Sequence, residues 1–246
     1  QASVVRVLQV GDARVVLRDF KDRWQFSTNY LVYERGGRDP YALLERLPLG
    51  PGAVALDVGA NLGLVSIVLA QRAAPGARVF ALEPHPALYR YLLWNLRENN
   101  VTGRVWPLNL GGCDVRRGQV VSFWPWWEPR GARAVLPDVP PDALRGLRTR
   151  RRSACTTLKR LLAALRVGEV DLLKLDCEGC EWGFLGFDGG AFFDAAVRGG
   201  RIRRVVGELH RASRVGRPGL GTVLRAMCSK AGGGCNAELQ RCDEFL

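Results

Sequence analysis

Hydrophobic residues follow two different periods along the chain, and the change from one to the other comes near residue 50. Before it, apolar and polar residues alternate in three runs, which predicts strands or hairpins: VVRVLQV at 4–10, ARVVLRDF at 13–20 and WQFSTNYLVY at 24–33. DPYALLERL at 39–47 predicts a helix opened by an Asp-Pro pair. Residues 1–50 are therefore expected to form an extension that packs on a main domain, residues 51–246.

The main domain alternates between strand and helix patterns. Strands are predicted at 53–58, 77–83, 104–110, 119–124, 170–176 and 203–210, and helices at 63–74, 86–99, 158–166 and 219–230. Such alternation predicts an α/β fold with a mostly parallel central sheet that carries helices on both faces.

Residues 125–153 interrupt this pattern and are predicted to form an insertion loop rich in Trp and Pro. The segment holds five prolines and a cluster of arginines at 145, 148, 150, 151 and 152. Trp126 could stack on a sugar ring or a base of a substrate, or it could pack the loop onto the sheet.

The net charge of +12 predicts some attraction to polyanions. However, 32 of the 36 cations are Arg, which together with abundant Ala, Gly, Leu and Val also fits a GC-rich coding bias. The longest apolar runs, such as LVSIVLA, fall far short of the roughly 20 residues that span a bilayer.

The seven cysteines are an odd number and fit no compact disulfide framework. Cys177 and Cys180 form a C-x-x-C, but the chain has no second such motif and only two histidines. A zinc or redox role is therefore disfavoured, and the two cysteines are interpreted as incidental to the acids around them.

A glycine-containing turn follows the first strand of the main domain, in LDVGANLGLVS. Gly59, Asn61 and Gly63 would let a ligand approach the backbone and the start of the next helix. Glu83 ends the following strand, where an acid accepts hydrogen bonds from ribose hydroxyls in nucleotide-binding α/β folds. The turn and the acid together predict a nucleoside-binding crevice. A dinucleotide motif G-x-G-x-x-G would need glycine in place of Asn61.

Five blocks of the sequence, in order, resemble the FkbM family of class I methyltransferases: DVGANLGLVS, EPHPALYRYLLWNLRENN, TTLKRLL, DLLKLDCEGCEWGFL and VVGELH. The family's usual forms are DVGANxGxxS, EPxPxxxxxLxxN, TSLDDLL, DLIKIDVEGAExxVL and ExH. The resemblance covers residues 53–210 and implies a Rossmann-like fold with S-adenosylmethionine as cofactor. It further implies that the cofactor is bound by Asp57, Gly59, Asn61, Gly63, Glu83, His85 and Asp114. His85 reads equally well as an ordinary exposed loop histidine.

Methyl transfer to a hydroxyl needs a proton acceptor near the carboxyl ends of the strands. His210 or Asp176 is expected to take this role, and Asp176 could instead orient the cofactor amine or the acceptor. Lys174 has the same strand parity as Asp176 and is placed with it in the catalytic group. Glu178, Glu208 and Trp126 are expected to contact the acceptor. No metal is expected, although Asp176, Glu178 and Glu208 have suitable ligand types.

The sequence thus predicts O-methylation of a carbohydrate or small-molecule hydroxyl. One alternative is an RNA 2′-O-methyltransferase, suggested by the net charge and the arginine cluster. Another is a degenerate methyltransferase fold that only binds, suggested by the weak strand pattern of the last 16 residues, AGGGCNAELQRCDEFL. The cysteines at 228, 235 and 242 favour a secretory lumen, whereas free thiols would favour the cytoplasm.

Overall fold

The computed structural model describes residues 3–20, 49–113, 120–123, 134–135, 151–177, 180–185 and 191–207. The chain divides into two compact units, Gln1–Asn109 and Leu110–Leu246. The predicted elements at 24–33, 39–47 and 219–230 lie outside the described residues. Within the described part, none of the helices has the length and apolar content needed to cross a membrane.

Among its described residues, the first unit contains a hairpin and three parallel strands with two helices between them in sequence. Its elements are β1 (Ser3–Val10), β2 (Ala13–Phe20), β3 (Val54–Val58), α2 (Leu64–Arg72), β4 (Arg78–Leu82), α3 (Pro86–Glu98) and β5 (Val105–Leu108). The hairpin is antiparallel with Val10 opposite Ala13, and Gly11 adopts a φ of 61° in its two-residue turn. Glycine at the first turn position matches a type II′ hairpin.

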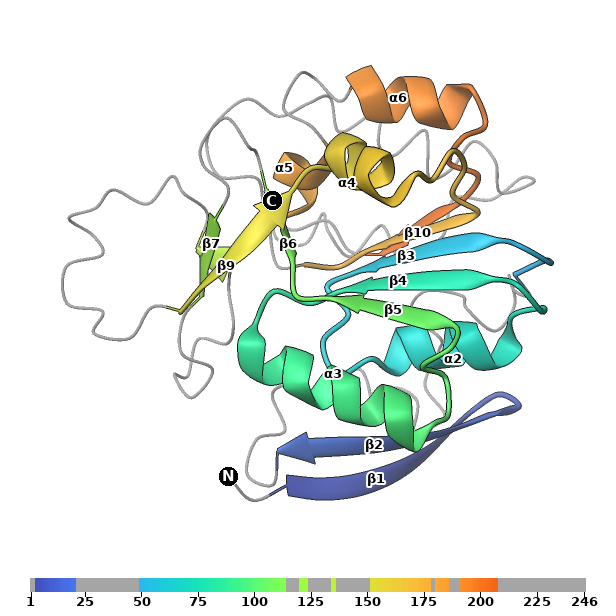
Figure 1. Cartoon of the computed structure of the whole chain (residues 1–246), viewed down its shortest axis with the longest axis vertical. Helices are drawn as coiled ribbons and strands as arrows, with labels where there is room; N and C mark the ends of the chain where they lie inside the picture. Colours follow the sequence, from blue (N-terminus) through green and yellow to red (C-terminus); the bar gives the residue numbers. More distant parts are fainter. Residues whose placement is uncertain are drawn as a thin grey trace, which may run out of the picture. The chain divides into compact units, whose positions relative to one another are not determined.

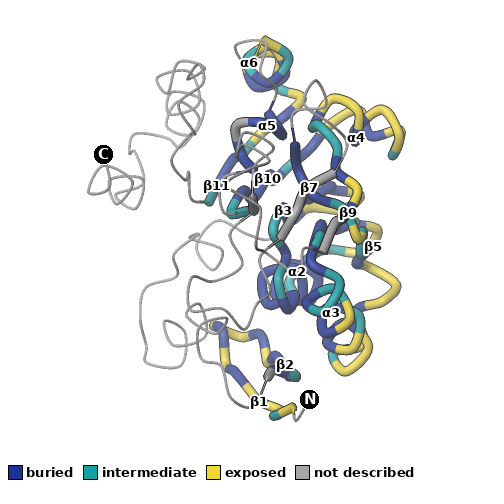
Figure 2. Tube along the Cα trace, turned by 90° about the vertical axis from the view of Figure 1, so that its left-hand side faces the viewer, coloured by how far each residue is buried: buried dark blue, intermediate teal, exposed yellow. Residues whose placement is uncertain are grey.

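Helices α2 and α3 form a layer between the hairpin and the parallel strands (Figure 1). Strands β3, β4 and β5 lie side by side in that order, with Val54 opposite Arg78 and Val79 opposite Val105. Helix α2 is buried from Leu64 to Ala70 (Figure 2). A helix that is apolar on all sides needs cover on both faces, and β2 and β4 supply it.

Helix α3 is amphipathic and begins at a well-defined cap. Pro86 occupies its first turn and the His85 side chain accepts hydrogen bonds from the helix amides. The residues that α3 buries recur every three or four positions, as expected for one helix face: Leu88, Tyr91, Leu92, Asn95 and Leu96.

The part of the second unit that the structure describes contains a small mixed sheet, a parallel strand pair and three short helices. Its elements are β6 (Gly111–Gly112), β7 (Val120–Phe123), β8 (Ala134–Val135), β9 (Arg151–Thr156), α4 (Leu158–Leu165), β10 (Leu172–Leu175), α5 (Glu181–Leu185), α6 (Ala191–Arg198) and β11 (Val205–Gly207). The mixed sheet has the order β6-β9-β7-β8. Strands β10 and β11 are parallel neighbours, with Leu173 opposite Val205.

Parallel strands alternating with helices confirm the predicted α/β class, but several elements differ from the prediction, among them β6 and α5, which were not predicted. Strand β8 and the start of β9 lie within residues 125–153, which were predicted to be loop. Strand β9 begins with Arg151 and Arg152 and pairs with β7 in the antiparallel direction. Its polar start carries no alternating pattern, so tertiary pairing rather than local propensity forms this strand. Helix α6 was also not predicted.

Candidate functional site

The turn between β3 and α2 has the backbone shape of a ligand-binding loop. Gly59, Asn61 and Gly63 all adopt positive φ, at 81°, 53° and 94°. A β-carbon added to Gly63 would lie 2.6 Å from Cδ1 of Leu92 on α3. Glycine is therefore required at 63 both for its backbone conformation and for the close approach of the helix. We call residues 59–63 the glycine loop.

Glu83 links the glycine loop to the turn after β4. Its carboxylate accepts hydrogen bonds from the backbone amides of Asn61, at 2.9 Å, and His85, at 2.7 Å. The residue is only 4% exposed, and amides bonded to a buried carboxylate compensate part of its desolvation cost. A carboxylate offers about four acceptor positions, so these two contacts are compatible with the predicted contact to a ribose hydroxyl.

Asp57 is fully buried at the end of β3, where the Ser66 hydroxyl on α2 donates a 2.6 Å hydrogen bond to its Oδ2 atom. This bond joins the strand to the helix on either side of the glycine loop. Ser66 was not singled out in the sequence as a site residue, although it closes the DVGANLGLVS block.

His85 is buried, at 2% exposure, and is not an exposed loop histidine. Its Nδ1 atom accepts from the amides of Ala87, at 3.2 Å, and Leu88, at 3.5 Å. A ring nitrogen that accepts carries no proton, so this arrangement corresponds to the neutral ring protonated at Nε2. The structure gives His85 a capping role on α3, and its contact with a cofactor stays a prediction.

Asn61 carries an acceptor that fits a bound ligand. Its Oδ1 atom is buried and has no hydrogen-bond partner among the described residues. Burying a carbonyl oxygen without a hydrogen bond costs about 1–3 kcal/mol of folding free energy. A hydrogen-bond donor of a ligand in the glycine loop would offset this cost. Asp57, Asn61 and Glu83 thus fit the cofactor-binding set that the sequence predicts.

In the second unit, one predicted catalytic residue, Lys174, lies in strand β10, and another, Asp176, follows it. All four of its residues are buried, and Lys174 is 2% exposed. Asp176 follows the strand and is half-buried. The neighbouring β11 ends at Gly207, where an added β-carbon would lie 1.7 Å from the carbonyl oxygen of Leu175. Only glycine allows the two strands to approach this closely one residue before Asp176.

A disulfide and a hydrogen bond both stabilise the turn that follows β10. Cys177 and Cys180 form a disulfide, so the pair that was interpreted as incidental is bonded in the folded chain. In addition, Glu181 is fully buried and its Oε1 accepts from the Cys177 amide at 3.0 Å. The carboxylate thus reaches back from the first residue of α5 to a backbone amide that precedes the helix.

A second disulfide joins Cys113, which follows β6, to Cys155 on β9. Gly112, which precedes Cys113 in the sequence, lies close to the other disulfide, because a β-carbon added there would lie 2.5 Å from the Cys180 sulfur. Four of the seven cysteines are therefore used in bonds that the sequence spacing did not indicate.

Several predicted site residues lie outside the described part of the chain: Asp114, Trp126, Glu178, Glu208 and His210. Their roles stay predictions. Within the described segments there is no group of three or more His, Cys, Asp or Glu side chains able to hold a metal ion. The first unit brings together Asp57, the glycine loop and Glu83.

Sequence reasoning missed Asn95 on α3. Its side chain is fully buried and donates a 2.8 Å hydrogen bond to the carbonyl of Leu62 in the glycine loop. The signal was present, because the resembled form EPxPxxxxxLxxN ends in asparagine at this position.

Comparison with known proteins places these features in one family. The Methyltransferase FkbM domain matches residues 57–227. AMB antimetabolite synthetase AmbE of Pseudomonas aeruginosa is 30% identical over 215 residues, which are 75% of this chain and 10% of that protein. Protein-L-isoaspartate O-methyltransferase of Aeropyrum pernix is 41% identical over 63 residues, 26% of this chain and 24% of that protein. The chain thus spans a quarter or less of the length of these two relatives.

Solved structures with some likeness include cofactor-bound Rv0187 from MTB, at 19% identity and a TM-score of 0.34, covering 63% of this chain and 47% of that one. An O-methyltransferase from Bacillus cereus in complex with SAH is 15% identical, with a TM-score of 0.34, over 63% of this chain and 49% of that one. The family match covers more than half of the chain and contains the glycine loop, Glu83 and Asp176. This chain belongs to the methyltransferase FkbM domain family.

Proposed function

We propose that the protein transfers a methyl group from S-adenosylmethionine to a hydroxyl oxygen of a carbohydrate or another small molecule. The observation that carries the proposal is the first unit's site, in which the glycine loop is fixed beside the buried acids Asp57 and Glu83. Family membership supports the reaction class. The match to a segment of an antimetabolite synthetase supports a small-molecule acceptor.

The cofactor's parts are assigned by donor and acceptor type. Glu83 accepts from the ribose hydroxyls, as acids after the second strand do in related nucleotide-binding folds. The Asn61 Oδ1 atom accepts from the amino group of the methionine part, which supplies the donor that this buried oxygen needs. Gly59 and Gly63 keep the loop backbone free of side chains.

When bound, S-adenosylmethionine supplies an electrophilic methyl group whose bond to sulfur breaks as the bond to the acceptor oxygen forms. Asp176 is the described residue proposed to receive the acceptor's proton, and His210 is the second candidate for this step. Asp176 suits the role because it follows the buried strand β10 and is itself half-buried.

Cofactor binding is tested first, by isothermal titration of S-adenosylmethionine into the unaltered protein. We expect saturable binding to one site. Absence of binding would contradict the proposal, and binding of NADH in its place would indicate a dehydrogenase.

Methyl transfer is tested next, with labelled cofactor and a panel of glycans, small hydroxyl compounds and RNAs. Labelling of glycans or small molecules supports the proposed acceptor class, whereas labelling of RNA alone would overturn it. Asp176→Asn should lower kcat at least 100-fold and change cofactor affinity less than threefold, because it removes a proton acceptor and no cofactor contact. Asp171→Asn is the matched control at the other end of β10, where Asp171 pairs with Arg203 at 2.7 Å, and should leave kcat within twofold.

A further inference from the structure

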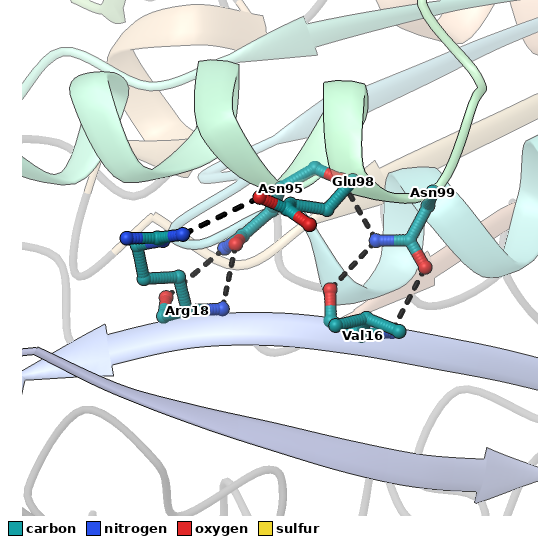
Figure 3. Close-up of polar contacts among 5 residues, drawn as sticks. All are labelled: Val16, Arg18, Asn95, Glu98 and Asn99. Atoms are coloured by element: carbon teal, nitrogen blue, oxygen red, sulfur yellow. Dashed lines mark hydrogen bonds and ion pairs between the residues drawn. The ribbon is translucent and has the colours of Figure 1, made fainter.

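Asn95 of α3 and Asn99, which caps the C-terminal end of α3, bind the edge of β2 as a neighbouring strand would (Figure 3). Asn99 accepts from the Val16 amide at 2.8 Å and donates to the Val16 carbonyl at 2.6 Å. Asn95 accepts from the Arg18 amide at 2.7 Å and donates to the Arg18 carbonyl at 3.2 Å. Each side-chain amide thus satisfies both backbone groups of one strand residue.

The spacing explains why both asparagines fit. Four residues of an α-helix rise about 6 Å, and two residues of a β-strand rise about 6.8 Å. Side chains one helical turn apart therefore meet alternate residues of a strand that runs beside the helix. An exposed ion pair between Arg18 and Glu98, at 3.3 Å, accompanies the two asparagines and adds little by itself.

Asn95 differs from Asn99 in its third contact. The Asn95 Nδ2 group also donates to the carbonyl of Leu62, at 2.8 Å, whereas the Asn99 Nδ2 group donates to the Asn95 carbonyl within α3, at 2.7 Å. Asn95 and Leu62 are both buried, at 0% and 1% exposure. Removing the donor would leave a buried carbonyl without this hydrogen bond.

The contact completes a set of restraints on three successive residues of the glycine loop. The Asn61 amide is held by Glu83, the Leu62 carbonyl by Asn95, and Gly63 by its close packing against Leu92. Leu92 and Asn95 lie three residues apart on the same face of α3. Helix α3 therefore supplies two of these three restraints.

We infer that Asn95 is a positioning residue for the cofactor, which couples the glycine loop to the β1–β2 hairpin through a single side chain. The inference rests on the proposed binding of S-adenosylmethionine in that loop. Because coupling between two sites is reciprocal, cofactor binding should stabilise the hairpin contact, and loosening that contact should weaken cofactor binding.

The test compares Asn95→Asp with Asn99→Asp. Either carboxylate can still accept from its strand amide but can no longer donate, and each adds one negative charge to the same face of α3. Only Asn95→Asp removes the bond to Leu62. We expect it to weaken S-adenosylmethionine binding at least tenfold by isothermal titration, whereas Asn99→Asp stays within threefold. Equal effects of the two variants would overturn the inference.

Hydrogen exchange on the unaltered protein gives a readout that does not depend on how a variant folds. Addition of S-adenosylmethionine should slow exchange of the Arg18 amide, which is bonded to Asn95, at least fivefold. In Asn99→Asp the slowing should persist, and in Asn95→Asp it should be lost. If the unaltered protein binds cofactor and Arg18 exchange does not change, the inference is wrong. If it binds no cofactor, the proposed function fails instead.

Discussion

The two units of the chain fix their strand ends with different bonds. The first unit contains no cysteine, since all seven lie at or beyond residue 113. Two hydrogen bonds hold its glycine loop: the Asn61 amide donates to the Glu83 carboxylate, and the Asn95 side chain donates to the Leu62 carbonyl. The described residues of the second unit include two disulfides, one of them in the turn that follows β10. These hydrogen bonds form in the folded chain whatever the redox conditions, whereas a disulfide forms only where the conditions around the protein are oxidising enough.

Because the bonds differ, substitutions should affect the two units in different ways. A hydrogen bond to a charged group contributes about 1.5–3 kcal/mol, and removing one partner leaves the other buried and unsatisfied. A disulfide acts mainly on the unfolded chain, and the effect grows with the length of the closed loop. Single substitutions should therefore change binding in the first unit and global stability in the second.

The largest effect is expected from Glu83→Gln. The amide keeps one acceptor oxygen, but its NH₂ group would face one of the two backbone amides that now donate to the carboxylate. S-adenosylmethionine affinity should fall at least 100-fold by isothermal titration. Glu98→Gln, which alters an exposed pair on α3, should change affinity less than twofold. If the affinity of Glu83→Gln for the cofactor stays within threefold of that of the unaltered protein, Glu83 does not bind the cofactor as proposed.

An intermediate effect is expected from replacing both Cys113 and Cys155 with alanine. Their sequence separation is 42, and a loop of this length corresponds to about 4 kcal/mol in the chain-entropy description. Urea denaturation should give a free energy of unfolding lower by about 2–4 kcal/mol. Dithiothreitol should lower the stability of the unaltered protein more than that of the double variant, which retains the short-loop Cys177–Cys180 bond but lacks the long-loop Cys113–Cys155 bond. A change below about 1 kcal/mol would show that this bond does not hold the unit together.

The smallest effect is expected from replacing both Cys177 and Cys180 with alanine. Their separation of three residues corresponds to about 2 kcal/mol at most, and Glu181 still holds the Cys177 amide. Labelled methyl transfer by the double variant should stay within threefold of the unaltered protein. A tenfold loss of kcat with unchanged cofactor affinity would instead assign the disulfide a part in orienting Asp176.

Local sequence signals were reliable where burial and capping act together. The run at 53–58 and the helix opened by Pro86 both appear in the structure close to the predicted bounds. Strand β9 and helix α6 were not predicted from the sequence, because a polar strand start and an eight-residue helix carry weak periodic signals. Both depend on partners far away in the sequence, β7 for the strand and α4 for the helix.

The sequence by itself determined the family, the α/β alternation and the acids and glycines of the cofactor region, because these follow from short motifs in fixed order. Only the tertiary structure decided how those residues are held. The Glu83 carboxylate bonds two backbone amides, Asn95 joins the hairpin to the glycine loop, and Cys177 pairs with Cys180. Side-chain bonds to backbone groups leave little trace in a sequence, because every residue offers the same amide and carbonyl. Which of them a side chain reaches is fixed by packing, which brings residues as far apart as Arg18 and Asn95 within hydrogen-bond distance.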